Sequence, residues 1–142
     1  MTADEIRHVF VIGAGTMGQQ IALQCAMHGC DVSVYDVSPG ALQSARARIQ
    51  EYAARLVGEK RLTDEASAAA LARLRFTGRP EDAANADLLS ESVPEDPELK
   101  GRVVAQFNEI RPPRAIFTTD TSTLVPSMFA AATGRPAQFA AF

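Results

Sequence analysis

Val9-Phe-Val-Ile-Gly-Ala-Gly-Thr-Met-Gly18 is the stretch of this chain that decides its fold. Four apolar residues that favour a strand run directly into a Gly-x-Gly-x-x-Gly turn, and a helical pattern follows at once. Gly13 permits the tight exit from the strand, and Gly15 has no Cβ to keep a pyrophosphate away from the backbone. Gly18 lets the new helix pack closely on the strand. The free N–H groups and the dipole at the start of that helix favour an anion.

A second strand follows this helix and points to the class of ligand. It is Asp31-Val-Ser-Val-Tyr-Asp36, and its closing acid lies a little over 20 residues after Gly13. A carboxylate at this spacing accepts hydrogen bonds from the ribose hydroxyls of NAD and repels a 2′-phosphate. An ordinary glycine-rich turn is the alternative, but strand, helix and acid together favour a dinucleotide site. We predict NAD as the cofactor, bound by Gly13, Gly15, Thr16, Met17, Gly18 and Asp36.

Length and composition limit how many domains the chain can form and which kinds of partner it can have. The 142 residues are enough for one domain with a real core, and 46% hydrophobic and 22% charged residues are ordinary for a globular protein. A formal net charge of −3 provides no basic field for nucleic acid, and no apolar run approaches the roughly 20 residues of a membrane span. The acidic start Met1-Thr-Ala-Asp-Glu5 does not resemble a signal peptide.

Two cysteines bear on the compartment and on metal binding. Cys25 and Cys30 fit neither a CxxC motif nor the spacing of a metal site. We therefore expect no metal, and two buried thiols in a cytoplasmic protein.

Strand and helix patterns alternate along the rest of the chain. They predict strands at 7–12, 31–36, 75–78, 86–91, 115–119 and 138–142, and helices at 16–28, 40–57, 64–74, 98–110 and 127–132. Such alternation predicts an α/β fold, a doubly wound parallel (Rossmann) sheet with strand order 3-2-1-4-5-6. The helix pair between residues 40 and 74 is longer than a crossover requires. It is an inserted helical hairpin, either without a role in binding or acting as a flap over the distal end of the substrate.

Polar residues gather where three of these strands end. They are Asp36, the segment 92–95 and the segment 119–123. Ligands of doubly wound sheets bind beyond the carboxyl ends of the strands. A solvated loop would also be polar, but the three groups coincide with the glycine turn, which favours a site there.

Four segments together resemble the NAD-binding domain of the L-3-hydroxyacyl-CoA dehydrogenases. They are Val-Ile-Gly-Ala-Gly-Thr-Met-Gly, Val-Tyr-Asp, Glu91-Ser-Val-Pro-Glu95-Asp-Pro-Glu-Leu-Lys100 and Thr121-Ser-Thr-Leu. The resemblance covers essentially the whole chain. It implies an NAD-dependent oxidoreductase of fatty acid metabolism that oxidises the 3-hydroxyl of an acyl-CoA such as 3-hydroxybutyryl-CoA. It also implies a homodimeric full-length protein.

The resemblance assigns roles to residues of this chain. Glu95 and Lys100 match residues beside the nicotinamide and its ribose, and Ser122 matches the catalytic serine that hydrogen-bonds the reacting oxygen of the substrate. The hairpin matches one that contributes to holding coenzyme A. Lys60 and Arg61, in its turn, are the candidates for contacting the phosphates of that substrate.

The resemblance also places the family's general-base histidine directly after Phe142. Residues 1–142 are therefore expected to be an NAD-binding domain truncated at its C-terminal end, without the helical domain that forms the dimer. By itself the chain is expected to bind the nucleotide without turnover.

Two departures from the family pattern leave alternatives open. Asp120 stands where the family has Asn, and Leu124-Val-Pro-Ser127 is closer to a side branch that includes lambda-crystallin, gulonate dehydrogenase and carnitine dehydrogenase. One alternative is therefore a dehydrogenase of a free hydroxy acid. Another is a non-catalytic nucleotide-binding module.

Overall fold

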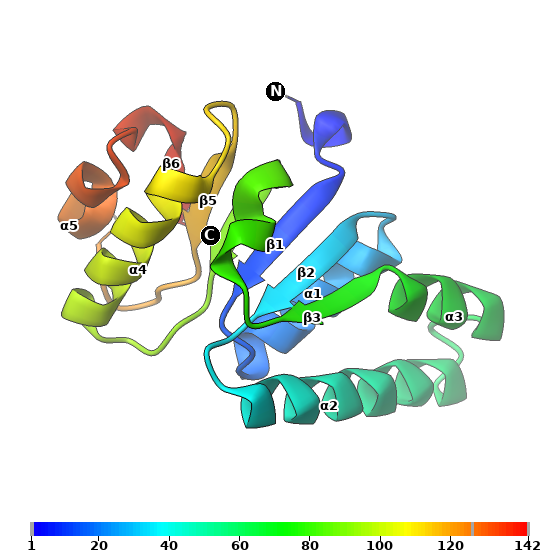
Figure 1. Ribbon diagram of the computed structural model, residues 1–142. Helices are drawn as coiled ribbons and strands as arrows, with labels where there is room; N and C mark the ends of the chain where they lie inside the picture. The colour runs from blue at the N-terminus through cyan, green and yellow to red at the C-terminus, as the bar shows by residue number, and fades with distance from the viewer. Residues whose placement is uncertain (1, 126, 142) are drawn as a thin grey trace.

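A computed structural model describes residues 2–125 and 127–141 of the chain. Within these residues, six parallel strands form one sheet in the order β3-β2-β1-β4-β5-β6, as predicted (Figure 1). The strands are β1 (His8–Ile12), β2 (Asp31–Tyr35), β3 (Leu74–Thr77), β4 (Leu88–Glu91), β5 (Ile116–Thr119) and β6 (Phe139–Ala141). The α-helices are α1 (Thr16–Met27), α2 (Pro39–Gly58), α3 (Asp64–Ala72), α4 (Pro97–Ile110) and α5 (Ser127–Ala130). No helix in the described part of the chain is long and apolar enough to cross a membrane.

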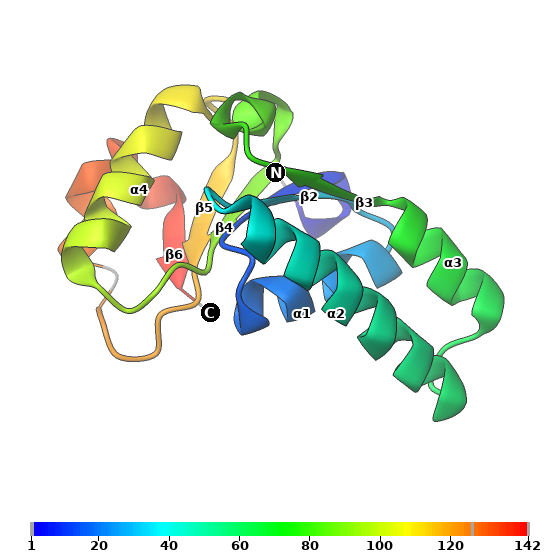
Figure 2. The same cartoon turned by 60° about the horizontal axis from the view of Figure 1, so that its bottom comes forward.

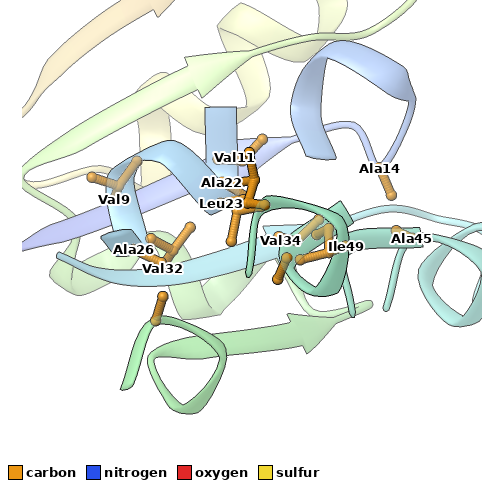
Figure 3. Packing of buried hydrophobic residues seen from close by; sticks show 13 residues of the cluster. Val9, Val11, Ala14, Ala22, Leu23, Ala26, Val32, Val34, Ala45 and Ile49 are labelled. Atoms are coloured by element: carbon orange, nitrogen blue, oxygen red, sulfur yellow. The ribbon is translucent and has the colours of Figure 1, made fainter. Parts of the chain in front are cut away.

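Helices cover both faces of the sheet, which explains the unbroken apolar run of β1. Val9 and Val11 point to the face where Ala22 and Leu23 of α1 and Ile49 of α2 pack against them (Figure 3). Phe10 and Ile12 point to the opposite face, where α4 packs through side chains that include Val104 and Phe107. The alternation of successive side chains along one strand thus builds two separate cores.

Strand β1 lies at the point where the winding of the sheet reverses direction. Ile12 at its end is in register with Tyr35 of β2 on one side and with Glu91 of β4 on the other. The crossover through α1 leads to β2, whereas the later part of the chain builds outward from β4 on the other side. A reversal of this kind leaves a crevice at the carboxyl ends of the strands.

The predicted hairpin is formed by α2 and α3. Ser38 Oγ accepts a hydrogen bond from Ala41 N at 3.2 Å at the start of α2, and Thr63 Oγ1 accepts one from Ala66 N at 3.1 Å at the start of α3. Figures 1 and 2 show α2 starting near the β1–α1 turn and the turn of the hairpin lying at the far end of α2. The 20 residues of α2 span about 30 Å.

Two expectations about this half of the fold were wrong. The helix predicted to reach residue 74 ends at Ala72, because Leu74 already pairs with Val32 in the sheet, a tertiary contact that overrides helical spacing. The two cysteines are each half-buried and not fully buried. Burial still raises the pKa of the Cys25 thiol to about 11, so this group stays protonated near neutral pH.

Candidate cofactor and substrate site

A cavity of about 650 Å³ opens at the carboxyl ends of the strands, where the winding reverses. The glycine turn forms its middle, the end of β2 forms one half, and the loops after β4 and β5 form the other. Its charged and hydroxyl-bearing lining residues are Thr16, Tyr35, Asp36, Ser92, Glu95, Asp120 and Ser122. Most residues predicted to form the site are therefore brought together, although they come from separate segments.

Two of the three motif glycines are required by the fold itself. Gly13 has a φ of +108°, and a Cβ on it would lie 2.6 Å from Ser92 O. A Cβ on Gly18 would lie 2.0 Å from Gly13 O. The tight turn and the close helix–strand packing predicted for these positions are thus confirmed.

The third glycine leaves space for a ligand. Nothing lies within 4 Å of a Cβ built on Gly15, which lines the cavity. Gly15 is also the N-cap of α1, and no side chain among the described residues caps this helix. The first N–H groups of α1 therefore lack intrahelical acceptors and can donate to an anion. Both features fit the pyrophosphate of a dinucleotide.

Asp36 is held in place by the backbone around it. Its Oδ2 accepts a hydrogen bond from Ala14 N at 3.0 Å, and its Oδ1 accepts one from Ser38 N at 2.9 Å. The next residue, Val37, is 82% exposed and lines the cavity, so it offers an apolar surface to a ligand beside Asp36. Sequence analysis did not single out Val37, although an apolar residue directly after the strand-end acid was the available signal.

Replacing Asp36 with alanine is expected to weaken NAD binding about tenfold and to narrow the preference for NAD over NADP. The reason is that a charged acceptor for the ribose hydroxyls is lost together with its repulsion of a 2′-phosphate. Titration calorimetry with both nucleotides measures the two affinities. Asp64→Ala, at an exposed position in the first turn of α3, is the matched control and should change neither. Equal affinity of the unmutated protein for NAD and NADP would contradict the role of Asp36.

The other half of the cavity rests on a buried ion pair. Lys100 Nζ, which is fully buried, donates to Glu91 Oε1 at 2.8 Å and to Glu91 Oε2 at 3.1 Å. It also donates to Val93 O at 3.1 Å. Glu91 Oε2 accepts a further hydrogen bond from Thr119 Oγ1 at 2.7 Å. This network ties the loop after β4 to the first turn of α4 and to the end of β5.

Glu95 joins this ion pair to the loop after β5. Its Oε2 accepts hydrogen bonds from Thr121 Oγ1 at 2.7 Å and from Thr123 Oγ1 at 2.8 Å, and its Oε1 lies 3.4 Å from Lys100 Nζ. The hydrogen bond from Thr121, with those from Thr123 and the charge of Lys100, holds the pKa of Glu95 below its usual value. Glu95 is therefore an ionised wall of the cavity at neutral pH.

Three further polar side chains stand at this half of the cavity. Ser122 is exposed, and Asp120 is half-buried. Ser92 also lines the cavity, and its buried Oγ has no hydrogen-bond partner in the described part of the chain. A buried hydroxyl without a partner is costly, so Ser92 fits a site that a polar ligand completes.

Four of the residues predicted to take part in the site do not line this cavity: Gly18, Lys60, Arg61 and Lys100. Gly18 instead packs against the backbone of the glycine turn. Lys100 is enclosed between Glu91 and the loop after β4, and Glu95, with which it pairs, lies between it and the cavity. Lys60 is in the hairpin turn, with a φ of +57°, and lines a separate shallow pocket with Arg61. About 30 Å of α2 separates that turn from the glycine turn.

A groove of about 510 Å³ between α1 and α2 begins at Thr16, which also lines the main cavity. Arg48, Tyr52 and Arg55 of α2 line it, and the Arg55 guanidinium lies 4.5 Å from the centre of the Tyr52 ring. Sequence analysis did not identify these arginines. Their signal was the i, i+4, i+7 spacing with Tyr52, which places all three side chains on one helix face.

The two histidines lie outside the cavity. His8 is at the start of β1, at the opposite edge of the sheet, with its Nδ1 3.6 Å from Asp87 Oδ2. His28 is at the end of α1, with its Nδ1 2.9 Å from Gln24 O. Neither histidine is therefore placed to contact a ligand bound in this cavity.

Comparison with known proteins agrees with this geometry. The sequence profile described as "3-hydroxyacyl-CoA dehydrogenase, NAD binding domain" matches residues 8–142. A 3-hydroxybutyryl-CoA dehydrogenase from Bradyrhizobium diazoefficiens is 40% identical over 134 residues, which are 94% of this chain and 46% of that protein. The chain thus spans about half the length of this relative.

Solved structures agree as well. A (S)-3-hydroxybutyryl-CoA dehydrogenase from Ralstonia eutropha superposes with a TM-score of 0.93 at 33% identity, covering 96% of this chain and 48% of that one. A diketoreductase described as acting on dicarbonyl compounds superposes with a TM-score of 0.90 at 38% identity, covering 99% of this chain and 50% of that one. With the glycine turn, Asp36 and the switch-point cavity in place, these matches lead to one conclusion: the chain belongs to the 3-hydroxyacyl-CoA dehydrogenase family and is its NAD-binding domain.

Proposed function

We propose that the full-length protein is an NAD-dependent dehydrogenase that oxidises the 3-hydroxyl of a 3-hydroxyacyl-CoA such as 3-hydroxybutyryl-CoA. The observation that carries this proposal is the cavity in which Asp36, the glycine turn and Ser122 line one continuous space. This chain spans about half of the relative from Bradyrhizobium diazoefficiens, which supports a further domain in the full-length protein. We also propose, from the family resemblance alone, that this domain is helical and forms a homodimer. The two free cysteines, Cys25 and Cys30, support a cytoplasmic location.

Each part of the cavity has a defined task in this proposal. When bound, NAD accepts the hydride from C3 of the substrate. The N–H groups at the start of α1 hold the pyrophosphate, and Asp36 holds the adenosine ribose. Glu95, fixed by Thr121 and Thr123, borders the nicotinamide ribose, and Lys100 acts by holding Glu95 and the loop after β4.

Ser122 has the catalytic task. Its exposed hydroxyl, at the cavity wall, donates a hydrogen bond to the reacting oxygen of the substrate. The proton of the substrate hydroxyl needs a base, and neither histidine of this chain lines the cavity. We therefore propose that the base lies outside the chain. Since a positioned base contributes about 10²–10⁴ in rate, residues 1–142 alone should bind NAD without measurable turnover.

The charges on the cavity bear on the choice between an acyl-CoA and a free hydroxy acid. Asp36, Glu95 and Asp120 are the charged residues of its lining, and no lysine, arginine or histidine among the described residues joins them. The carboxylate of a short free acid would meet like charges near Ser122, whereas a thioester is neutral at that end. The cavity therefore supports an acyl-CoA. The likeness to a diketoreductase makes a dicarbonyl compound, reduced by NADH in the reverse direction, the second candidate substrate.

Assays of the full-length protein with NAD test this proposal. We compare 3-hydroxybutyryl-CoA with 3-hydroxybutyrate and follow the reduction of NAD by its absorbance. The acyl-CoA should be oxidised with the higher kcat/KM. A higher value for the free acid would overturn the acyl-CoA assignment, and NAD binding without turnover of either compound would favour a non-catalytic module.

Replacing Lys60 and Arg61 together with alanine is expected to raise the KM for 3-hydroxybutyryl-CoA at low salt and to leave NAD affinity unchanged. Both are exposed, so their attraction for the phosphates of coenzyme A acts through charge and fades with screening over about 10 Å at 0.1 M salt. Steady-state kinetics at about 0.02 and 0.3 M salt measure the effect.

The matched variant is Arg48→Ala with Arg55→Ala, in the groove nearer the glycine turn. It removes the same amount of positive charge from the same hairpin. If this pair raises the KM and the Lys60/Arg61 pair does not, the phosphates lie in the groove, and the role assigned to Lys60 is wrong.

A further inference from the structure

The half of the cavity formed by the loops after β4 and β5 is acidic. Asp36 stands at the end of β2, on the adenosine side, whereas Glu95 and Asp120 follow β4 and β5 on the opposite side of the glycine turn. A dinucleotide that binds across this crevice with its adenosine ribose on Asp36 would extend its nicotinamide toward the loops after β4 and β5. Glu95 and Asp120 are therefore the charged residues of the lining that would flank the nicotinamide.

The nearby cation does not neutralise this half. Lys100 Nζ is bound first by Glu91, at 2.8 and 3.1 Å, and lies 3.4 Å from Glu95. Glu91, Glu95 and Asp120 together carry three negative formal charges against the single positive charge of Lys100. Among the described residues, the Asp120 carboxylate forms no hydrogen bond or ion pair, and only its backbone N–H donates, to Glu91 O at 3.2 Å. No described residue therefore offsets the negative charge of Asp120, and this charge can act on a bound ligand.

The two redox forms of the cofactor differ in how they respond to such a field. The nicotinamide ring carries one positive charge when oxidised and none when reduced, while the rest of the dinucleotide is the same. A negative charge about 8 Å from the ring, at an effective dielectric constant of about 40, strengthens the binding of the positively charged form by roughly five- to tenfold relative to the neutral form. The difference in affinity between the two forms therefore reports the field at the ring.

We propose that Asp120 makes this site select the oxidised cofactor, binding NAD⁺ more tightly than NADH. This inference rests on the proposed function, since it needs the nicotinamide to lie in the β4–β5 half of the cavity. The selectivity is assigned to Asp120, in the β4–β5 half of the cavity, and not to the glycine turn. By thermodynamic linkage, tighter binding of NAD⁺ lowers the reduction potential of the bound cofactor, by about 30 mV for each tenfold difference in affinity.

The test measures the dissociation constants of NAD⁺ and NADH for the unmutated protein and for Asp120→Asn, by titration calorimetry and by NADH fluorescence. Asp120→Asn keeps the shape of the side chain and removes its charge. The ratio of the NADH constant to the NAD⁺ constant should fall about five- to tenfold in this variant, mainly because NAD⁺ binding weakens. Thermal melting of both proteins verifies that the fold is retained.

Asp36→Asn is the matched control, because it makes the same chemical change in the adenosine half of the same cavity. It should weaken both redox forms by the same factor and leave the ratio unchanged. An unchanged ratio in Asp120→Asn, or an equal change in Asp36→Asn, would overturn the role of Asp120 while leaving the proposed function intact. If the unmutated protein bound neither form, the proposed function would fail together with this inference.

Discussion

Gly18→Ala is expected to destabilise the protein by about 1–3 kcal/mol or more and to abolish measurable NAD binding. The added Cβ would lie 2.0 Å from Gly13 O and 3.3 Å from Val11 Cγ1. The first of these is a backbone atom and cannot rotate away, so the first turn of α1 must move off β1. That movement separates the helix N-terminus from the glycine turn, the two parts that we propose hold the pyrophosphate. Urea denaturation measures the stability, and calorimetry measures the binding.

Substitutions at two other glycines distinguish the loss of stability from the loss of NAD binding. Gly15 has a φ of −74° and open space around its Cβ position, so Gly15→Ala should keep the stability and weaken NAD binding by occupying the approach to the backbone. Gly101, inside α4, has nothing within 4 Å of a Cβ, so Gly101→Ala should stabilise the protein by about 0.5–1 kcal/mol without affecting binding. If Gly18→Ala kept both the stability and the NAD affinity of the unmutated protein, the close packing of α1 at Gly18 would be required for neither, and the prediction would be wrong.

Lys100→Met is expected to lower the free energy of unfolding by about 3–5 kcal/mol. Lys100 is fully buried and Glu91 is 1% exposed, so the substitution leaves a buried carboxylate without its cation. Hydrogen bonds from Val93 N and Thr119 Oγ1 remain on Glu91, but they do not supply the lost charge. Urea denaturation at pH 7 measures the loss.

A second substitution in the same ion pair shows whether the stability loss in Lys100→Met comes from the unpaired charge or from altered packing. Glu91→Gln combined with Lys100→Met removes both charges and should recover a large part of the lost stability, because no unpaired ion is left in the interior. Lys60→Met, at an exposed position, serves as the surface control and should change stability by no more than about 0.5 kcal/mol. A double variant no more stable than Lys100→Met alone would show that the loss comes from packing.

Local features of the sequence determined most of the fold. The glycine turn follows from backbone geometry, since Gly13 needs a positive φ and Gly18 a close contact within five residues. Ser38 and Thr63 each cap a helix through a donor three residues on, so the caps are visible in any linear reading. Because crossovers between parallel strands follow few topologies, alternating strands and helices then predicted the strand order. Asp36 and the NAD cofactor could also be predicted, because the acid at the end of the second strand lies at a characteristic distance along the chain from the glycine turn.

The tertiary structure alone decided how the charged residues pair. Lys100 lies on the apolar face of α4 with Val104 and Phe107, but its burial depends on Glu91 at the end of another element. The bonds from Thr121 and Thr123 to Glu95 join residues 26 and 28 positions apart, beyond the reach of helix or strand periodicity. A charged residue reads the same in a sequence whether it meets water or a buried partner. Only the packing of β4, α4 and β5 decides this. It makes Lys100 a support of the site, and it leaves Asp120 as a charge that no described residue pairs.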